Sequence, residues 1–219
     1  MYDIIPDFVL QKIRDRYLAG VSDAEATFSD NKGDEDSLTG ALGQAISTKV
    51  PISIKTDDGL YQYSINYRKL RGRGPNAPEK KFGADGIFQI AVYRGDGKLL
   101  RQKGLPFQAK KQWNHADKNL VKQAHKMLHL TGQGLVVDYS PAGYTACSAR
   151  EVVHANGKKR ALKAEGQLHD LGHVLANDFL ECKIGAPNLY YDVEREVFTS
   201  EQPLQFIPHH AINTIIGIL

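Results

Sequence analysis

Asp85, Gln108 and Lys110 carry side chains that could act together on one substrate if the chain brings them to one place. Between them lies Asp96-Gly97, a dipeptide typical of the two-residue type I′ turn, in which both central residues need positive φ. With this turn, the numbers of opposed residues sum to 193, so Asp85 faces Gln108. Side chains alternate along a strand, so Lys110 shares a face with Gln108, and Ala109 points the other way. The sequence therefore predicts that a carboxylate, an amide and an ammonium group converge.

A fourth candidate, Glu35, opens a helix that is predicted over 35–47 from its apolar spacing. On a helical wheel, Glu35 falls roughly 20° from the apolar stripe centred on Leu42, whereas its two acidic neighbours fall about 80° and 120° away. A carboxylate directed at the edge of a core is costly unless it meets a cation or a donor. We therefore expect Glu35 to meet a metal ion or Lys110, the alternative being a helix-start acid favoured by the macrodipole.

Positive charge gathers on both sides of this site. Side chains of this kind neutralise phosphates without regard to base sequence, although charge runs are also common on plain solvated surfaces. No base-reading module is visible, so no sequence specificity is expected. The predicted nucleic-acid contacts are Arg68, Lys69, Arg71, Arg73, Lys80, Lys81 and Lys111.

Histidines offer a rival chemistry. His169 and His173 stand at i and i+4, a spacing that could place two metal ligands on one helical face and that would suit a His-metal phosphohydrolase. However, Asp170 occupies the position where the catalytic glutamate of an HExxH site would lie, so core or surface histidines are favoured. The pair at 209–210 has no evident partners and is expected to be structural or exposed.

The predicted elements place these residues on an α/β framework. Helices are expected over 7–19, 35–47, 115–130 and 167–181. Strands are expected over 50–54, 60–65, 86–93, 99–111 and 134–139, with one more strand or edge before 153. A bulge at Gly104–Pro106 would shift the register and turn Asp85 to the other face. A central sheet sandwiched by helices follows from this order of elements.

Composition restricts the class of protein. The chain has 219 residues, of which 42% are hydrophobic and 24% charged, with a net charge of +3. These proportions exclude disorder, collagen and coiled coil, and they fit one soluble domain over 1–219. The two cysteines fit no metal-ligand spacing and are expected to be reduced core residues. No signal peptide and no run of about 18 apolar residues occurs, so we expect a cytoplasmic protein with no membrane partner.

The arrangement resembles the PD-(D/E)xK, or restriction endonuclease-like, nuclease superfamily, in the variant whose second acid is glutamine. The resemblance rests on Glu35 in an early helix, Gly83-Ala84-Asp85 at the start of a strand, and Gln108-Ala109-Lys110 in its hairpin partner. The segment 107–111 is similar to Mrr-like restriction nucleases and to nuclease domains of anti-phage effectors. The resemblance implies a restriction endonuclease-like core over about 30–140, with a C-terminal extension over 141–219 that serves assembly or recognition.

The resemblance also implies Mg²⁺-dependent hydrolysis of DNA, with Mn²⁺ as a substitute, and RNA stays open as an alternative to DNA. Asp85, the Gln108 side-chain oxygen, the Ala109 carbonyl and Glu35 would hold the metal, and Lys110 would act on the attacking water. Gln123, in the following helix, would be an accessory residue. Partners would be a second copy of the chain or an activating subunit. The alternative is a non-catalytic nucleic-acid-binding or scaffold subunit with the same fold.

Overall fold

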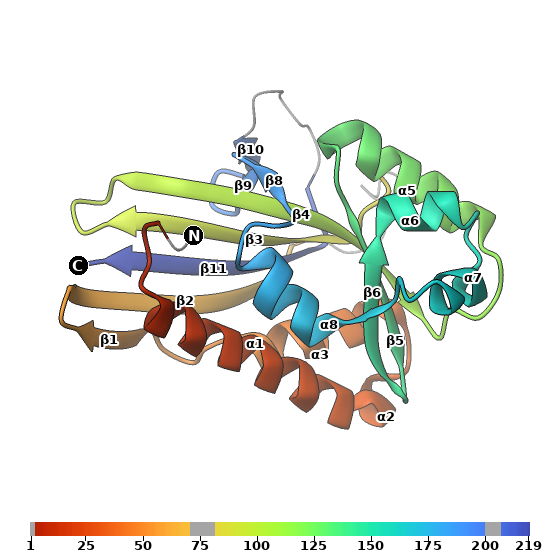
Figure 1. The fold of residues 1–219 in the computed structure, drawn as a ribbon, viewed down its shortest axis with the longest axis horizontal. Coiled ribbons are helices and arrows are strands. Elements are labelled where there is room, and N and C mark those ends of the chain that lie inside the picture. Colours follow the sequence, from red (N-terminus) through yellow and green to blue (C-terminus); the bar gives the residue numbers. More distant parts are fainter. Residues whose placement is uncertain (1–2, 71–81, 200–206) are drawn as a thin grey trace.

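The structure is a computed structural model that describes residues 3–70, 82–199 and 207–219. One large mixed sheet runs through it, with helices on both faces (Figure 1). The α/β class and the mixed central sheet flanked by helices are therefore confirmed. The strands follow the order β1-β2-β11-β3-β4-β5-β6-β7, and β8 pairs with β4. Their bounds are β1 Ile52–Thr56, β2 Gly59–Lys69, β3 Gly86–Arg94, β4 Leu99–Lys111, β5 Leu135–Ser140, β6 Gly143–Ser148, β7 His169–Asp170, β8 Ala186–Pro187 and β11 His210–Ile218.

Two apolar clusters hold the helices to opposite faces of the sheet. The larger cluster joins the sheet to α1, α3 and the helical segment over 171–180, and the second joins it to α5, α6 and α7. A separate two-stranded sheet of β9 and β10 packs on the main sheet through a third apolar cluster, which joins Ile87 to Tyr191 and Phe198. The bounds are α1 Asp7–Ala26, α2 Phe28–Asn31, α3 Glu35–Ile46, α5 Lys118–Thr131, α6 Ala149–His154, α7 Lys159–Ala164, α8 Leu171–His173, β9 Tyr190–Asp192 and β10 Val197–Thr199.

Local signals set the ends of the two helices nearest the site. Asp34, the residue before Glu35, caps α3: its carboxylate accepts a hydrogen bond from Ser37 N at 2.8 Å. Asp117 caps α5 in the same way, through the backbone N–H groups of Asn119 and Leu120. A side-chain oxygen at this position satisfies backbone donors that have no partner within the helix. Both helices agree with the predicted ranges to within three residues.

The β3–β4 hairpin reaches the predicted register by a different route. Its loop has three residues, since Arg94 N donates to Lys98 O at 2.9 Å and Tyr93 pairs with Leu99. The predicted two-residue turn is therefore wrong. A register shift follows directly, between Val92 and Tyr93, and from Val92 to Gly86 the pairs again sum to 193. The longer loop and the bulge cancel, and no bulge occurs at 104–106.

The C-terminal segment is the middle of the sheet. Strand β11 runs antiparallel to β2 and parallel to β3, with His210 opposite both Lys69 and Gly86. The buried apolar residues of β11 join the same cores as those of β3. Part of the predicted extension over 141–219 thus belongs to the central sheet, because β11 completes the sheet that carries the predicted site.

The region from 143 to 181 differs in detail from the prediction. Strand β6 leads into the short helix α6, which begins with a capping box of Ser148 and Glu151. The predicted helix over 167–181 is instead strand β7, then α8, then a π-helical segment over Val174–Phe179. No helix in the described parts of the chain is long and apolar enough to cross a membrane.

Candidate active site

A small cavity of about 50 Å³ lies where α3, β3, β4 and β11 meet. Sheet register explains the meeting, because the starts of β3 and β11 are opposed and Gly86 pairs with Phe107 of β4. Residues far apart in the sequence thus reach one end of three neighbouring strands. The lining residues are Glu35, Asp36, Thr39, Asp85, Ala109, His209 and His210.

Asp85 is fixed by both its side chain and its backbone. Its Oδ2 accepts hydrogen bonds from Gln108 Nε2 at 2.5 Å and from Ala109 N at 2.8 Å. Its carbonyl accepts from the backbone N–H groups of His209 and His210 at 2.9 and 3.2 Å. Asp85 is 9% exposed, and the donors to its carboxylate offset the cost of burying a charged group.

Gly83 lets the chain reach this position. Its φ is +73°, and a Cβ there would lie 2.3 Å from the carbonyl oxygen of Gln123 in α5. Glycine alone adopts this conformation at little cost and allows the two backbones to approach. Gln123 is itself buried, and its backbone serves as the surface on which the turn before Asp85 rests.

Gln108 lies fully buried beside Asp85. Its Nε2 also donates to the Ala109 carbonyl at 3.2 Å, whereas its Oε1 has no hydrogen-bond partner among the described residues. The amide N–H₂ thus lies between two oxygens, and the amide oxygen is buried without a donor. If the amide is rotated by half a turn, the oxygens of Asp85, Gln108 and Ala109 face one another. Such a set of hard oxygen donors fits Mg²⁺ or Mn²⁺.

Glu35 reaches the same cavity from the first turn of α3. Its Oε1 accepts a hydrogen bond from Lys111 N at 3.2 Å. The donor that Glu35 meets is therefore a backbone N–H and not the expected Lys110. The Lys111 ammonium donates to the carbonyls of Lys32 and Gly33, each at 3.1 Å. Lys111 therefore secures the start of α3, and its charge is engaged within the protein.

Lys110 is oriented toward α5. Its Nζ lies 3.9 Å from Oδ2 of Asp117, the cap of that helix, and its side chain is 15% exposed. Lys110 does not occur among the described residues that line the cavity. The structure thus brings Asp85, Gln108, Ala109 and Glu35 together, and it places Lys110 two residues further along β4 at the start of α5.

A polar cluster that sequence reasoning missed borders the cavity. His210 lies between Asp36 and Tyr67, with Nε2 2.9 Å from Asp36 Oδ1 and Nδ1 2.9 Å from the Tyr67 hydroxyl. Lys69 forms an ion pair with the same Asp36. Burial, opposed by the nearby Asp36 carboxylate, lowers the pKa of His210 to about 4, so the ring is neutral at neutral pH.

His209 also lines the cavity. Of the two expected alternatives, structural or exposed, the exposed one is wrong because both histidines are buried, and His210 has partners in Asp36 and Tyr67. His209 is 7% exposed, and its Nε2 has no partner among the residues that the structure describes. The sequence held one indication of their place: both histidines directly precede an apolar run, as Asp85 precedes the apolar strand β3. What the sequence could not show is that the two runs pair in parallel.

The predicted nucleic-acid contacts divide into three groups. Arg68 is exposed near the end of β2, where its side chain is open to solvent. Lys69 and Lys111 are engaged by Asp36 and by backbone carbonyls, as described above. The remaining four, Arg71, Arg73, Lys80 and Lys81, lie outside the described residues.

The rival histidine site does not form. His169 belongs to strand β7 and His173 ends helix α8, where its Nδ1 lies 3.6 Å from Asp170, so the two rings do not share a helical face. The cysteines form no disulfide with each other: Cys147 is buried, as expected, and Cys182 is exposed, which corrects the prediction of two core residues.

Within the described ranges, no three His, Cys, Asp or Glu side chains group as metal ligands. A site built on Asp85 and Glu35 needs only two such residues, because Gln108 and Ala109 would supply amide and carbonyl oxygens. No protein-family model, curated protein or solved structure matches this chain. The geometry of the cavity therefore carries the functional argument.

Proposed function

We propose that this protein is a metal-dependent nuclease that hydrolyses phosphodiester bonds of DNA with Mg²⁺ or Mn²⁺. One observation carries the proposal: the Gln108 amide donates to both Asp85 and the Ala109 carbonyl, while its own oxygen is buried without a donor among the described residues, so that half a turn of the amide would bring three oxygens together. Glu35 opens into the same cavity and adds a second carboxylate. A buried amide oxygen without a donor is costly, and a cation would relieve that cost.

The chain's residues have distinct roles in this proposal. Asp85, Gln108, Ala109 and Glu35 bind the cation, which, when bound, offsets negative charge that develops on the phosphate. Lys110 shares a strand face with Gln108 and orients the attacking water after its ammonium leaves Asp117. The replacement of an acid by Gln108 leaves one negative charge fewer than two carboxylates would give, which favours one cation over two. Glu35 therefore contributes much of the remaining charge.

The basic side chains define the substrate. Phosphate neutralisation is independent of base sequence and sensitive to salt, which suits a nuclease without a base-reading module. Within the described residues, Arg68 and Lys69 are both exposed, and Lys69 is paired with Asp36. The resemblance to restriction and anti-phage nucleases leads us to propose a role in bacterial restriction or defence, with a second copy or an activating subunit as partner.

Cleavage assays test the proposal directly. Plasmid DNA, single-stranded DNA and RNA are incubated with the protein and Mg²⁺ or Mn²⁺, and EDTA is expected to abolish cleavage. Lys110→Ala should abolish cleavage and leave DNA affinity nearly unchanged, whereas Lys122→Ala, an exposed lysine on α5, should leave both unchanged. Cleavage that persists in EDTA or in Lys110→Ala would overturn the assigned roles.

A non-catalytic nucleic-acid-binding or scaffold subunit is the second candidate, and the position of Lys110 favours it. Its ammonium pairs with Asp117 rather than with a group of the cavity. In that case the protein would bind DNA with a steep salt dependence and cleave none of the substrates with either metal. Binding that is insensitive to Asp85→Asn and Glu35→Gln would further separate this candidate from the nuclease.

A further inference from the structure

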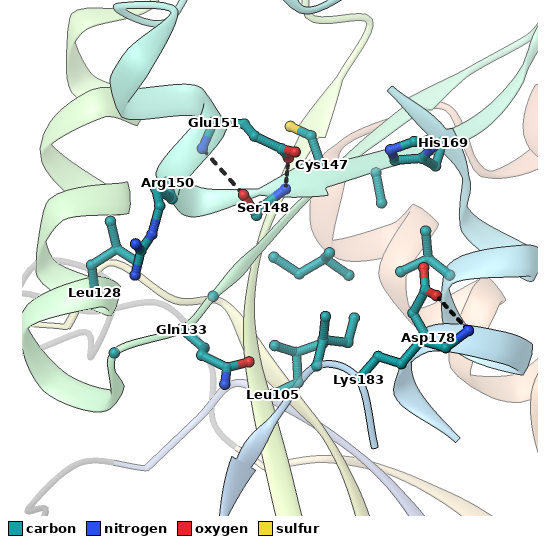
Figure 2. A pocket seen from close by; sticks show the side chains of 16 residues that line it. Leu105, Leu128, Gln133, Cys147, Ser148, Arg150, Glu151, His169, Asp178 and Lys183 are labelled. Carbon is teal, nitrogen blue, oxygen red and sulfur yellow. Dashed lines mark hydrogen bonds and ion pairs between the residues drawn. The ribbon is translucent and has the colours of Figure 1, made fainter. Parts of the chain in front are cut away.

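A second, larger pocket lies beside β4, where the pairing partner of this strand changes from β8 to β5. Strand β4 pairs with β8 at Lys103 and Gly104 and with β5 from Phe107 onward. Leu105 falls between these two partners, so on this side β4 has no pairing strand at Leu105, whereas on its other side Leu105 pairs with Phe88 of β3. The resulting pocket has a volume of about 410 Å³, within the range of sites that hold small organic molecules (Figure 2).

The walls of this pocket are largely apolar. They come from the sheet, from α5 and from the segment that follows α8. None of the residues that line this pocket lines the cavity at Asp85. Apolar walls favour a ligand with an apolar body, because burying it removes apolar surface from water. The apolar lining residues are Leu105, Leu128, Leu135, Ala146, Val174 and Ile184.

The polar groups of the rim are mostly donors. Arg150, on α6, extends from the rim between Leu128 and Ser148 (Figure 2), and it forms no ion pair or hydrogen bond with the described residues. The Gln133 side chain accepts from Gly185 N at 2.6 Å, which leaves its N–H₂ group directed elsewhere. An unpaired guanidinium on the rim of an apolar pocket suits an oxyanion.

The acids of the rim are engaged within the protein. Glu151 accepts from Ser148 N in the capping box of α6, at 2.6 Å. Asp178 lies 3.7 Å from the ammonium of Lys183. Their negative charges are thus partly compensated, whereas the charge of Arg150 is not.

We propose that this pocket binds a small organic anion, with an apolar body against the walls and a carboxylate, sulfonate or phosphate at Arg150. The site is separate from the one at Asp85 and does not depend on the nuclease proposal. The oxyanion chemistry is shared by these head groups, and the apolar body distinguishes the ligand from a free inorganic ion.

A matched pair of fluorescent probes tests this site in the full-length protein. 1-Anilinonaphthalene-8-sulfonate carries an anionic group, and N-phenyl-1-naphthylamine has the same rings without the charge. We expect the anionic probe to bind at least about tenfold more tightly, as a charge-assisted hydrogen bond would give. Inorganic phosphate alone should not displace it at millimolar concentration. Equal affinity for the two probes, or displacement by phosphate alone, would overturn the proposal.

Two variants and a control locate the binding. Arg150→Gln should weaken the anionic probe about tenfold and leave the neutral probe unchanged. Arg160→Gln, which removes an exposed arginine of α7 outside the pocket, should change neither. Ala146→Leu fills part of the pocket and should weaken both probes, and circular dichroism checks that it folds. An equal effect of the two arginine variants, or a folded Ala146→Leu that binds as tightly as the natural protein, contradicts the assignment.

Discussion

Oδ2 of Asp85 accepts a hydrogen bond from Nε2 of Gln108 at 2.5 Å, although the two residues are 23 positions apart in the chain, on the two arms of a hairpin. The amide donates its N–H₂ to the carboxylate and leaves its own oxygen buried without a donor in the described structure. This relationship links the fold to the proposed chemistry, because a cation bound beside the rotated amide would replace its two hydrogen bonds by contacts to three oxygens.

Gln108→Glu should make stability depend on metal. Without a divalent cation, two carboxylates would lie side by side, and the free energy of unfolding should fall by about 2 kcal/mol. Mg²⁺ should recover most of this loss, because a ligand at roughly a hundredfold above its Kd stabilises by about 2.7 kcal/mol, so thermal unfolding is compared with and without Mg²⁺. The control is Gln44→Glu, at an exposed position of α3. Equal Mg²⁺ responses of the two variants would count against a metal at Gln108.

Two glycines of α3 should respond to alanine in opposite directions. A Cβ at Gly43 would lie 2.3 Å from the ring of Tyr67, the residue that holds His210, whereas a Cβ at Gly40 would lie 3.5 Å from the Tyr67 hydroxyl. Gly43→Ala should therefore destabilise the protein by about 1–3 kcal/mol. Gly40→Ala should stabilise it by roughly 0.5–1 kcal/mol, because alanine favours helix. Urea unfolding measures both, and the same sign for both would contradict this packing.

Asp117 should matter to stability as a helix cap more than as the partner of Lys110. Its carboxylate accepts from two backbone N–H groups, at 2.8 and 2.9 Å, and its contact to Lys110 is longer, at 3.9 Å. Asp117→Asn keeps a capping oxygen and should change stability by less than about 0.5 kcal/mol, and Asp117→Ala should cost about 1 kcal/mol. Chemical denaturation distinguishes them. A loss in Asp117→Asn as large as in Asp117→Ala would show that the ion pair dominates.

Lys103 should make stability rise with pH. Its ammonium is buried over the Phe179 ring and donates to two backbone carbonyls, and burial lowers its pKa from 10.5 to about 8, with a smaller opposing effect of Cys182. Between pH 8 and 10.5 the unfolded chain therefore keeps a proton that the native protein has released. The stability contribution of this group is lowest below pH 8 and increases as pH rises to 10.5, by up to about 3 kcal/mol.

Comparison with Lys103→Met isolates that effect from other titrating groups. The unfolding free energy of the natural protein, minus that of the variant, should increase between pH 7 and pH 10.5. A difference that does not vary with pH would show that Lys103 titrates as an exposed lysine does.

The sequence predicted the local parts of this site and missed the long-range ones. Alternation and spacing sufficed for Glu35 on α3 and for the pairing of Asp85 with Gln108, because each depends on one helix or one hairpin. The hairpin prediction held although its turn was wrong, since the three-residue loop and the shift after Val92 offset each other. Register over the important pairs was thus correct for a reason that the turn dipeptide did not contain.

The place of β11 could not be read from the chain. Its apolar run is compatible with an edge, an interface or a central strand, and only pairing with both β2 and β3 decides among them. His209, His210 and their contact to the Asp85 carbonyl follow from that pairing. Likewise, alternation places Lys110 on the face of Gln108, but the position of its ammonium depends on where the cap of α5 lies.

The most direct test of the metal site is anomalous diffraction from crystals soaked in Mn²⁺, compared between the natural protein and Asp85→Ala. We expect one strong peak in contact with oxygens of Asp85, Gln108 and Ala109, with Glu35 nearby, and no peak there in the variant. Mn²⁺ found only elsewhere on the protein, or a peak that survives the loss of Asp85, would contradict this expectation.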